Sequence, residues 1–338
     1  YLLATIKGEG TWSAFARSHN FEPIIFGSNY SRVVDALLFW MPYLRLKWYL
    51  KKNSIDIIYV CGIKTTFWLR LFKVFMPNFK IVQGIRSNLR SQNLRDRFFR
   101  FMERHFSEES EFYISNSRAA STVLINQCKI KKNKIKVIHN GLGSLNNYPI
   151  IPFAEKKDTI CIISNFLPDK GHIEFLKVIQ IVLKTKPNAK FYFLGRDDMN
   201  GKVQAAITKH NLEDNIVIEG YVKDVRAFVK NIKVSALPSF SEGCPTSILE
   251  AMSVGTPAIG YNIDGIPELI ENDKQGYVIP CFDNDIFAQS ILSLLDDSKK
   301  YEEFQTAGLL RIQSDFTLEQ MSARHYKVWE TIMRNPSL

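Results

Sequence analysis

The sequence predicts an α/β protein whose strands form two doubly wound parallel sheets. Short apolar runs rich in β-branched and aromatic residues alternate with helical patterns along the chain, as in parallel sheets flanked by helices. A polar stretch with two prolines and no periodicity, residues 144–158, interrupts the alternation near the middle. With 338 residues, 46% of them hydrophobic, the chain is long and apolar enough for two domains with good cores and is not a disordered protein.

Apolar runs on both sides of the polar stretch are expected to be strands. The first series lies at residues 1–6, 23–27, 55–60, 79–83, 111–115 and 135–139. The second series lies at residues 159–164, 190–195, 215–220, 233–237, 257–261 and 277–280. The segments between them are expected to be helices, and the spacing of apolar residues at 317–333 predicts a last helix. The polar stretch is then the linker between a first domain at 1–149 and a second at 150–319, and the cleft is expected between them.

The positive charge of the chain is concentrated in its first half. The net charge is +10, yet residues 1–150 hold 23 Lys and Arg against 9 Asp and Glu, whereas the remainder holds 21 against 25. Basic and aromatic residues alternate at 39–52 and 90–106, a composition that suits amphipathic helices at an anionic membrane surface. The alternative is that the aromatic residues are core and the charged ones a solvated rim. No helix-turn-helix, zinc-finger or RNA-binding motif accompanies the charge, so nucleic acid is not expected as a partner.

Cysteine usage and hydropathy indicate the compartment. The five cysteines are widely spaced and show neither C-x-x-C nor His-partner spacing, so we expect no disulfide framework, no zinc site and a reducing compartment. No run of about 18 uncharged apolar residues occurs, and the start has no signal-peptide layout. We therefore expect a cytoplasmic protein with peripheral contact at the inner face of the cell membrane.

The most informative stretch is residues 239–270, which places Glu242 and Glu250 around the start of an expected helix. If both lay on that helix they would be about 12 Å apart, at about 1.5 Å per residue, so Glu242 is expected in the preceding loop. The first amides of the helix, near Thr246 and Ser247, are expected to face a diphosphate, because unpaired donors and the helix dipole favour negative charge there. Glu250, one to two turns further on, is placed to accept hydrogen bonds from two ribose hydroxyls.

The letters EGCPTSILEAMSVGTP, followed by DGIPE, resemble the E-x7-E region of retaining glycosyltransferases of family 4, which have the GT-B fold. Further similar segments occur in the same order along most of the chain: VIHNG at 137–141, PDKG at 168–171, FYFLG at 191–195, EGYVKDV at 219–225 and GYVIP at 276–280. The resemblance implies two Rossmann-like domains that face a cleft, with a last helix at 320–338 that crosses back onto the first domain. It also implies that the chain starts after the family's first strand and helix.

The reaction is implied by the same resemblance. A sugar would pass from a nucleoside diphosphate to a lipid-linked or glycan acceptor, with retention, in cell-surface polysaccharide biosynthesis. Such enzymes usually need no bound metal, because lysine, arginine and helix dipoles neutralise the diphosphate, so no cofactor is expected. Two other functions stay open, a GT-B nucleotide-sugar epimerase and a non-catalytic nucleotide-sugar-binding partner. A glycosidase fits less well, since its two acids lie on opposite sides of one bond.

Three residues are expected to take part in catalysis: Glu242, Lys170 and Arg86. Glu242 would bind hydroxyls of the donor sugar, and Lys170 in PDKG would hold the diphosphate as a point charge. The family usually has an arginine five residues before that lysine, where this chain has Asn165. Arg86 and Arg196 are candidates to replace its charge. Arg86 follows the expected fourth strand, where the family often has a histidine, and a guanidinium can hold a phosphate bidentately; the alternative is that it caps a loop.

The other expected contacts to the donor lie mainly in loops. Gly265 allows a close backbone approach ahead of a short helix opened by Pro267. Asp264 stands where the family frequently has another glycine, a change expected to tune the donor sugar. The nucleobase is expected near Gly220 and the two residues after it. The expected donor-binding residues are Glu250, Asn165, Gly243, Thr246, Ser247, Gly265, Ile266, Tyr221 and Val222.

Four residues of the first domain are expected to be structural. His139 in VIHNG is a lone histidine at a strand end. Asn140 and Gly141 after it are expected to form a backbone turn. Ser117 follows the expected strand at 111–115 and is placed to cap the next helix.

Overall fold

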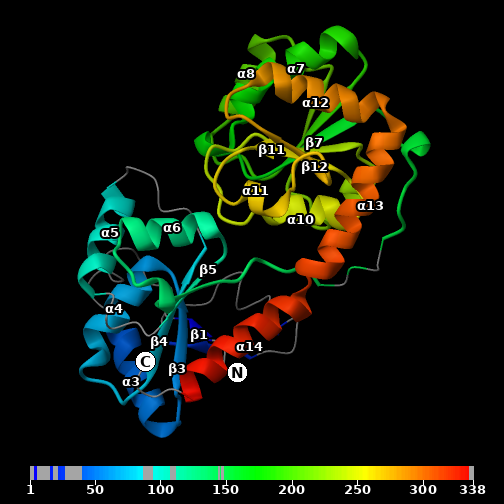
Figure 1. Cartoon of the computed structure of the whole chain (residues 1–338). Coiled ribbons are helices and arrows are strands. Elements are labelled where there is room, and N and C mark those ends of the chain that lie inside the picture. The colour runs from blue at the N-terminus through cyan, green and yellow to red at the C-terminus, as the bar shows by residue number, and fades with distance from the viewer. Residues whose placement is uncertain are drawn as a thin grey trace.

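Parallel strands form three sheets within the residues that the computed structural model describes, which are 4–5, 16–17, 22–26, 40–86, 94–106, 112–143, 145 and 148–334. The first lobe contains a pair of short strands, β1 (Ala4–Thr5) and β2 (Ile24–Ile25), and a four-stranded sheet. The second lobe contains a six-stranded sheet. Figure 1 shows the lobes one above the other, connected by the chain near residue 150 and by the last helices.

The order of the strands confirms the predicted parallel α/β architecture. The four-stranded sheet has the order β3 (Ile57–Cys61), β4 (Lys80–Ile85), β5 (Phe112–Ser115), β6 (Ile135–Val137). The six-stranded sheet has the order β12 (Gly276–Ile279), β11 (Ala258–Tyr261), β10 (Val234–Leu237), β7 (Thr159–Ile163), β8 (Lys190–Leu194), β9 (Ile216–Gly220). Its chain starts in the middle, moves out to β9, returns to β10 and moves out to β12, which is the doubly wound topology.

One expectation about the first sheet differs from the structure. The strands predicted at 1–6 and 23–27 pair with each other as β1 and β2, through Ala4 with Ile24 and Thr5 with Ile25. Within the described residues they are not hydrogen-bonded to the four-stranded sheet.

Helices cover both faces of the second sheet. They are α7 (His172–Thr185), α8 (Lys202–Lys209), α9 (Val225–Val229), α10 (Thr246–Ser253), α11 (Ile266–Leu269), α12 (Asn284–Asp296) and α13 (Ser298–Asp315). Alternate residues of the central strand β7 face opposite layers. Ile160 and Ile162 pack with α7, α8 and α12, whereas Cys161 packs with Val229 of α9 and Ala251 of α10. This burial on both faces explains why the strand reads as a continuous apolar run.

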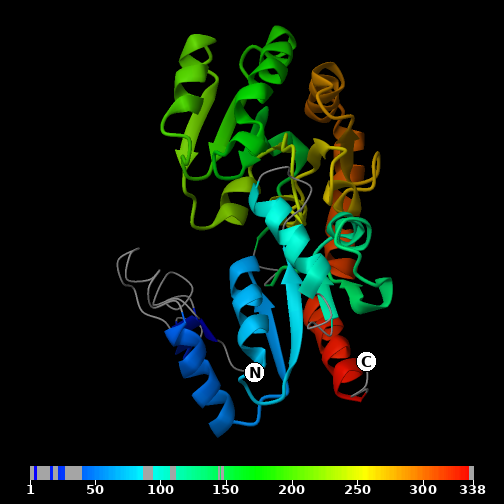
Figure 2. The ribbon, with the colours of Figure 1, turned by 90° about the vertical axis from the view of Figure 1, so that its left-hand side faces the viewer.

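The first sheet is covered on one face by four helices of the first lobe. They are α3 (Met41–Lys52), α4 (Ile63–Lys73), α5 (Leu94–Phe106) and α6 (Arg118–Asn126). Ile81 of β4 packs with Tyr43 and Leu69 from α3 and α4, and Ile85 belongs to a cluster with Phe99 of α5. Figure 2 shows α3 and α4, in blue, on the side of the sheet away from the last helix.

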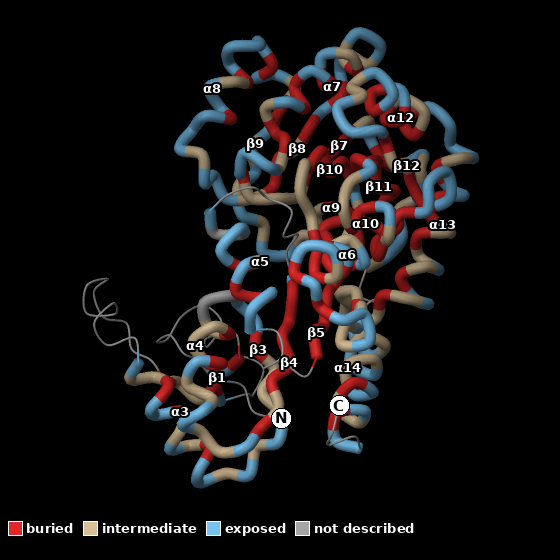
Figure 3. Tube along the Cα trace, turned by 60° about the vertical axis from the view of Figure 1, so that its left-hand side comes forward, coloured by how far each residue is buried: buried red, intermediate tan, exposed pale blue. Residues whose placement is uncertain are grey.

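The opposite face of the first sheet is covered by the last helix, α14 (Leu318–Arg334), although the chain reaches it from the second lobe. Val328 and Ile332 are buried against Val82 and Ile114. The Lys80 ammonium donates to the Ile332 carbonyl at 2.9 Å. Figure 3 shows α14 running beside the buried strands β4 and β5.

The stretch between the lobes is held by the second lobe. Arg226 donates to the Gly143 carbonyl at 3.0 Å, and its guanidinium lies 5.0 Å from the ring centroid of Tyr148. Further along, the buried Lys156 donates to the Ile232 carbonyl at 3.0 Å. The predicted linker at 144–158 therefore packs on the second lobe at both ends.

A buried polar network fixes the helix layer of the first lobe. Arg70 of α4 donates to both carboxylate oxygens of Glu103 of α5, each at 3.0 Å. Gln83 donates to Glu103 at 3.0 Å, and the Tyr113 hydroxyl donates to it at 2.6 Å. Both members of the ion pair are buried, so its hydrogen bonds replace the water that each charge loses.

Candidate active site at the carboxyl ends of the second sheet

Lys170 and Glu242 meet where two neighbouring strands of the second sheet end. Lys170 ends a short 3-10 turn, Pro168–Lys170, that follows β7, and Glu242 lies in the loop that follows β10. The lysine Nζ is 2.8 Å from Glu242 Oε1 and 3.3 Å from the Ser241 carbonyl oxygen. Both side chains are mostly buried, with 19% and 11% of their surface exposed. The sequence placed these residues in separate motifs, and the structure brings them into one ion pair.

The loop after β10, which carries Glu242, leads directly into α10. The helix begins at Thr246, and Pro245 before it makes no side-chain cap. Thr246 is exposed, whereas Ser247 is nearly buried. Amides in the first turn of a helix lack internal partners and attract anions. The expected placement of Glu242 in the loop and Glu250 on the helix is confirmed.

Glu250 is a partly buried carboxylate on α10. Burial raises its pKa above the usual value, while the positive charge of Arg226 acts in the opposite direction. Within the described part of the chain, its carboxylate accepts no hydrogen bond. A carboxylate that is desolvated without a donor is costly, and Glu250 keeps acceptor capacity that no described protein donor uses.

Asp264 holds the backbone of Glu242. Its Oδ2 accepts a hydrogen bond from the Glu242 amide at 3.1 Å. The φ angle of Asp264 is 50°, in the left-handed region that glycine adopts most readily. The aspartate therefore takes a backbone conformation that glycine adopts readily and adds a carboxylate to it.

Gly243 and Gly265 lie where backbones approach closely. A Cβ on Gly265 would come within 1.7 Å of the Gly243 carbonyl oxygen, and one on Gly243 within 2.8 Å of the Arg86 carbonyl oxygen. Any side chain at either position would displace backbone. The close approach expected at Gly265 is present, and its neighbour is the loop that carries Glu242.

Arg86 lies in the first lobe at the end of β4, with its carbonyl against Gly243. Burial lowers the pKa of its guanidinium, but the Tyr59 hydroxyl and the Cys61 thiol beside it outweigh that effect, and the net shift is upward. The guanidinium thus lies near the side chains of Tyr59 and Cys61 of β3.

Arg196, the other candidate for the leaving-group charge, follows β8 and lies beside Asn165, which follows β7 and stands in place of the family's arginine. Asn165 accepts a hydrogen bond from the Arg196 amide at 3.0 Å, and this leaves the Asn165 NH₂ group to donate to a ligand. The Arg196 guanidinium is 3.6 Å from Asp198 and 65% exposed. Its charge is therefore partly neutralised by a neighbour.

The remaining expected donor contacts divide into exposed and buried positions. Tyr221 follows Gly220 and is 73% exposed, so its ring is available for stacking. Val222 packs against the apolar cluster under α9. Ile266 is fully buried, and its amide donates to the Ile263 carbonyl at 3.1 Å. Both the side chain and the amide of Ile266 are therefore used within the protein, and its expected contact with the donor stays a prediction.

Glu268, which sequence reasoning did not single out, links the two lobes. It accepts hydrogen bonds from the amides of Arg118 and Ala119 at the start of α6, at 2.8 and 3.0 Å, and lies 2.8 Å from His139 Nε2. Burial raises the pKa of Glu268, but these three donors outweigh it and the net shift is downward. Ser117, as predicted, caps the same helix by accepting from the Ala120 amide.

The segment around His139 is more than a turn. The Asn140 side chain donates to the Cys244 carbonyl at 2.8 Å, across the lobes. A Cβ on Gly141 would lie 2.3 Å from the Thr317 carbonyl oxygen, just ahead of α14. Both residues therefore set how the lobes meet, in addition to turning the chain. In the sequence, these contacts between the lobes were indicated only by the two motifs that contain the residues, VIHNG at 137–141 and DGIPE at 264–268.

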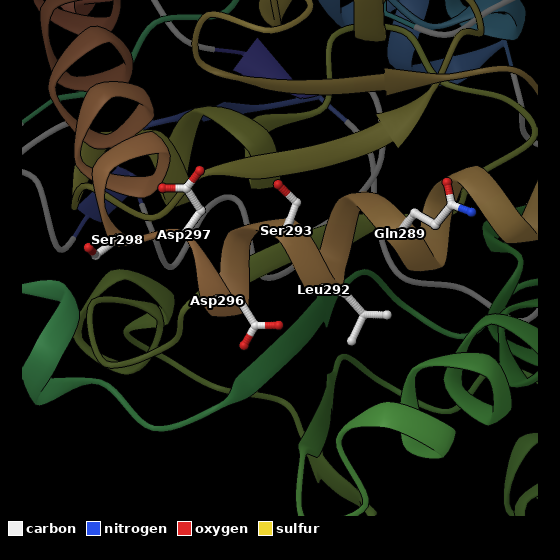
Figure 4. A pocket seen from close by; sticks show the side chains of 6 residues that line it. All are labelled: Gln289, Leu292, Ser293, Asp296, Asp297 and Ser298. Carbon is white, nitrogen blue, oxygen red and sulfur yellow. The ribbon is translucent and has the colours of Figure 1, made fainter.

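Two surface hollows lie away from these residues. One, of about 580 Å³, is lined by Gln289, Leu292, Ser293, Asp296, Asp297 and Ser298, where α12 meets α13 (Figure 4). Its two carboxylates already have structural partners, since Asp296 pairs with Lys186 and Asp297 caps α13. The other, of about 270 Å³, is lined by Leu145, Tyr148, Ile150, Ser253, Leu309, Ile312 and Gln313 beside the linker. Neither contains a residue expected in the site.

Among the described residues, no group of three or more His, Cys, Asp or Glu side chains is arranged to hold a metal ion. No helix in the same part of the chain combines the length and apolar character needed to cross a bilayer.

Comparison with known families and structures decides the fold. Residues 15–142 match the family described as Glycosyltransferase Family 4, and residues 146–311 match Glycosyl transferases group 1. A glycosyltransferase from Rickettsia africae superposes with a TM-score of 0.82 at 17% identity, over 99% of this chain and 90% of that one. The chain has the GT-B fold. Anabaena HepE, solved with UDP and glucose, is another GT-B neighbour, with a TM-score of 0.79 at 19% identity over 100% of this chain and 92% of that one.

Curated relatives with matching sequences are also glycosyltransferases. An Escherichia coli protein named UDP-Gal:alpha-D-GlcNAc-diphosphoundecaprenol alpha-1,3-galactosyltransferase is 28% identical over 52% of this chain and 49% of its own length. A Staphylococcus aureus poly(ribitol-phosphate) alpha-N-acetylglucosaminyltransferase is 23% identical over 80% of this chain and 54% of its own. This GT-B chain spans about half the length of both relatives.

Proposed function

We propose that the protein is a retaining glycosyltransferase that moves a sugar from a UDP-sugar to a lipid-linked or polysaccharide acceptor in cell-surface polysaccharide biosynthesis. The names of the relatives support this class of reaction. They include a galactosyltransferase that acts on a diphosphoundecaprenol-linked sugar and a putative colanic acid biosynthesis glycosyltransferase. Structures of the neighbours TarM and HepE contain UDP, which supports uridine as the base.

The observation that carries the proposal is the ion pair between Lys170 and Glu242, whose loop leads into α10, the helix that carries Glu250. Lys170 and the first amides of α10 would stabilise the charge that develops on the departing diphosphate. Glu242 would accept from hydroxyls of the transferred sugar, and Glu250 from the ribose. Lys170 has three donors, so it can keep Glu242 oriented at 2.8 Å while it binds a phosphate oxygen.

Retention is supported by the linkages in the relatives' names, which are α for galactose, glucose and N-acetylglucosamine. The common UDP-hexoses are α-linked at the anomeric carbon, so an α product preserves the configuration. The E-x7-E spacing of Glu242 and Glu250 supports retention as well, because it resembles the motif of retaining glycosyltransferases.

We also propose that transfer proceeds without a bound metal. The groups that replace it would be Lys170, the α10 amides and the Asn165 NH₂ group on the donor side, with Arg86 of the first lobe as a further candidate. These donors supply the charge stabilisation that a divalent cation provides in other sites.

A membrane-facing surface on the first lobe would bring the enzyme to a lipid-linked acceptor at the inner face of the cell membrane. Trp48 of α3, Phe75 after α4 and Phe101 of α5 are 71%, 64% and 55% exposed. Ring contacts connect these helices beneath the surface, from Tyr43 through Phe72, Trp68 and Phe67 to Phe98. The Lys51 ammonium lies 5.5 Å from the Trp48 ring. Exposed aromatic residues with adjacent basic ones suit the headgroup layer of an anionic membrane.

The proposed function is tested in two steps. Melting temperature is first measured with UDP, GDP and a panel of their sugars, and UDP-sugars are expected to raise it. Labelled donor is then incubated with membrane extract or isolated lipid-linked acceptor, and the label should enter the acceptor. A rearranged sugar formed from donor alone would instead identify an epimerase, and stabilisation without transfer to any acceptor would identify a binding protein.

A further inference from the structure

We infer that the exposed ring of Phe282, stacked on Phe240, forms a subsite on the second lobe that binds a pyranose ring of the acceptor glycan. The inference rests on the proposed function, since it assigns a place to the acceptor of that reaction. Phe282 lies in the loop after β12 and is 64% exposed. Its ring centroid lies 4.8 Å from that of Phe240, at an interplanar angle of 33°. The outer ring is therefore open to a ligand while the inner ring supports it.

The backbone of Phe282 has a conformation that bulky residues rarely adopt. Its φ angle is 66°, in the left-handed region. The residue stands third in a four-residue turn, in which the Asp283 amide donates to the Pro280 carbonyl at 3.1 Å. Turns with a positive φ at the third position favour glycine or asparagine there. A phenylalanine in this place is strained, and residues held under strain are concentrated where ligands bind. The strain therefore indicates a function for the ring.

The two rings rest on a buried aromatic cluster. Phe240 stacks on the fully buried Tyr261 of β11, with the ring centroids 6.1 Å apart. Tyr261 in turn meets the buried Phe287 of α12 edge-on at 5.2 Å. The Phe240 amide donates to the Asp169 carbonyl at 2.8 Å, which ties its backbone to the turn that carries Lys170. A support held in this way loses little freedom when a ligand binds, so the subsite is preorganised.

The order of the strands places this pair of rings beyond the sugar end of the proposed donor. The sheet runs β12, β11, β10, β7, β8, β9 with all pairs parallel, so the loops after these strands lie along one edge. The base is proposed near Tyr221 after β9, the diphosphate at Lys170 after β7, and the transferred sugar at Glu242 after β10. Phe240 is two positions before Glu242, and Phe282 after β12 continues the series. An acceptor that approaches the transferred sugar from this side would meet the rings.

The chemistry of the surface favours a glycan over an anionic membrane. The face of an aromatic ring carries partial negative charge, and one face of a pyranose presents weakly positive C–H groups while its hydroxyls stay at the rim. Burial, and then the charges of neighbours that include Asp283 and Glu174, raise the pKa of Tyr261 beneath the rings. Carboxylates near the rings repel anionic lipid headgroups but accept hydrogen bonds from sugar hydroxyls.

Three variants separate the ring from the turn that carries it. Phe282→Gly removes the ring, and glycine adopts a φ of 66° without strain, so the variant should fold with a melting temperature close to that of the wild type. Phe282→Trp keeps an aromatic face. Asn211→Gly is the control, because Asn211 is also exposed, has a φ of 54° and lies in the loop before β9.

The experiment measures the initial rate of label transfer from a UDP-sugar to membrane extract. The donor is the UDP-sugar that raises the melting temperature most, and it is kept saturating while the amount of extract is varied. We expect Phe282→Gly to need about tenfold more extract for half its maximal rate, as the loss of one stacking contact predicts. The KM for the UDP-sugar should stay unchanged. Phe282→Trp and Asn211→Gly should behave like the wild type.

Other results would overturn the inference. One is an unchanged requirement for extract in Phe282→Gly. Another is a loss of affinity for the UDP-sugar relative to UDP, which would place the donor sugar on the ring. A third is weaker sedimentation of Phe282→Gly with anionic vesicles, which would make the ring a membrane contact. If the wild type transfers no label to any extract, the proposed function fails and this inference fails with it; if only Phe282→Gly gives an unexpected result, the proposed function stands.

Discussion

Glu268 of the second lobe and His139 of the first form a hydrogen bond of 2.8 Å, although 129 positions separate them in the chain. The same carboxylate accepts hydrogen bonds from the amides of Arg118 and Ala119, so a side chain of the second lobe caps the start of α6 in the first lobe. A helix N-terminus favours a negative partner. The arrangement of the lobes therefore depends on an acidic residue that lies only a few positions after Asp264 and Gly265.

Replacing Glu268 by alanine should loosen the contact between the lobes. Hydrogen bonds to a charged group contribute about 1.5–3 kcal/mol each, and three donors would lose their acceptor. We expect small-angle scattering to show a larger radius of gyration for Glu268→Ala than for the wild type. Glu271→Ala is the control, since that glutamate pairs with the nearby Lys274. Identical scattering curves for the Glu268 variant and the wild type would exclude this role.

Glu250→Gln should stabilise the protein without ligand and weaken UDP binding at the same time. Burial raises the pKa of Glu250 in the folded state, so its ionisation opposes folding. The carboxyl therefore favours the folded state at pH below its unfolded pKa, and this advantage is lost as the pH rises through the folded value. At pH 7 the glutamine removes that cost, and we expect a gain of about 1 kcal/mol in denaturant unfolding. The UDP-induced rise in melting temperature should shrink, and an undiminished rise would rule out the ribose contact.

Lys170→Ala should reduce turnover more than nucleotide binding. The ammonium is proposed to meet charge that develops in the transition state, and loss of one such group costs about 100-fold or more in kcat. Affinity for UDP should fall less, because the α10 amides and Glu250 remain. Lys177→Ala, at an exposed position of α7, should leave both quantities unchanged. Equal losses in kcat and UDP affinity would argue against a leaving-group role for Lys170.

The features that could be predicted from the sequence are those that depend on residues close together in the chain. The strands β7 to β12 follow apolar β-branched runs, and the spacing of Glu242 and Glu250 placed one in the loop and the other on α10, as observed. Both conclusions rest on residues close together in the chain, for which periodicity and helix geometry are informative.

Long-range pairings were not predictable in the same way. Arg70 and Glu103 lie in helical segments rich in charge, which single-sequence patterns assign to a solvated face, yet both are buried. Ile266 follows Gly265 in a motif expected to face the donor, but a motif does not show which side of a short helix meets the core. His139 and Glu268 acquire their roles only when the two lobes come together.

The exposed aromatic surface of the first lobe predicts binding to anionic membranes. Trp48→Ser combined with Phe101→Ser should reduce the fraction of protein that sediments with vesicles containing phosphatidylglycerol, because the variant lacks two aromatic rings that would insert into the headgroup layer. Binding of the wild type should weaken with added salt and be slight on vesicles of phosphatidylcholine alone. Leu310→Ser, which removes an apolar side chain 60% exposed on α13 of the second lobe, serves as the control. Unimpaired vesicle binding by the double variant would remove this surface from the proposal.

The ion pair of Arg70 and Glu103 predicts strong coupling in a double-mutant cycle. Removing one partner leaves the other charge buried, so Arg70→Met or Glu103→Leu alone should destabilise the first lobe by about 3–5 kcal/mol. The double variant leaves neither charge, and its loss should be smaller than the sum of the two single losses by at least about 1 kcal/mol. Unfolding in urea, followed by the fluorescence of the first-lobe tryptophans, measures the three differences. Strict additivity would mean that the two side chains act independently, with the contacts to Gln83 and Tyr113 accounting for each loss.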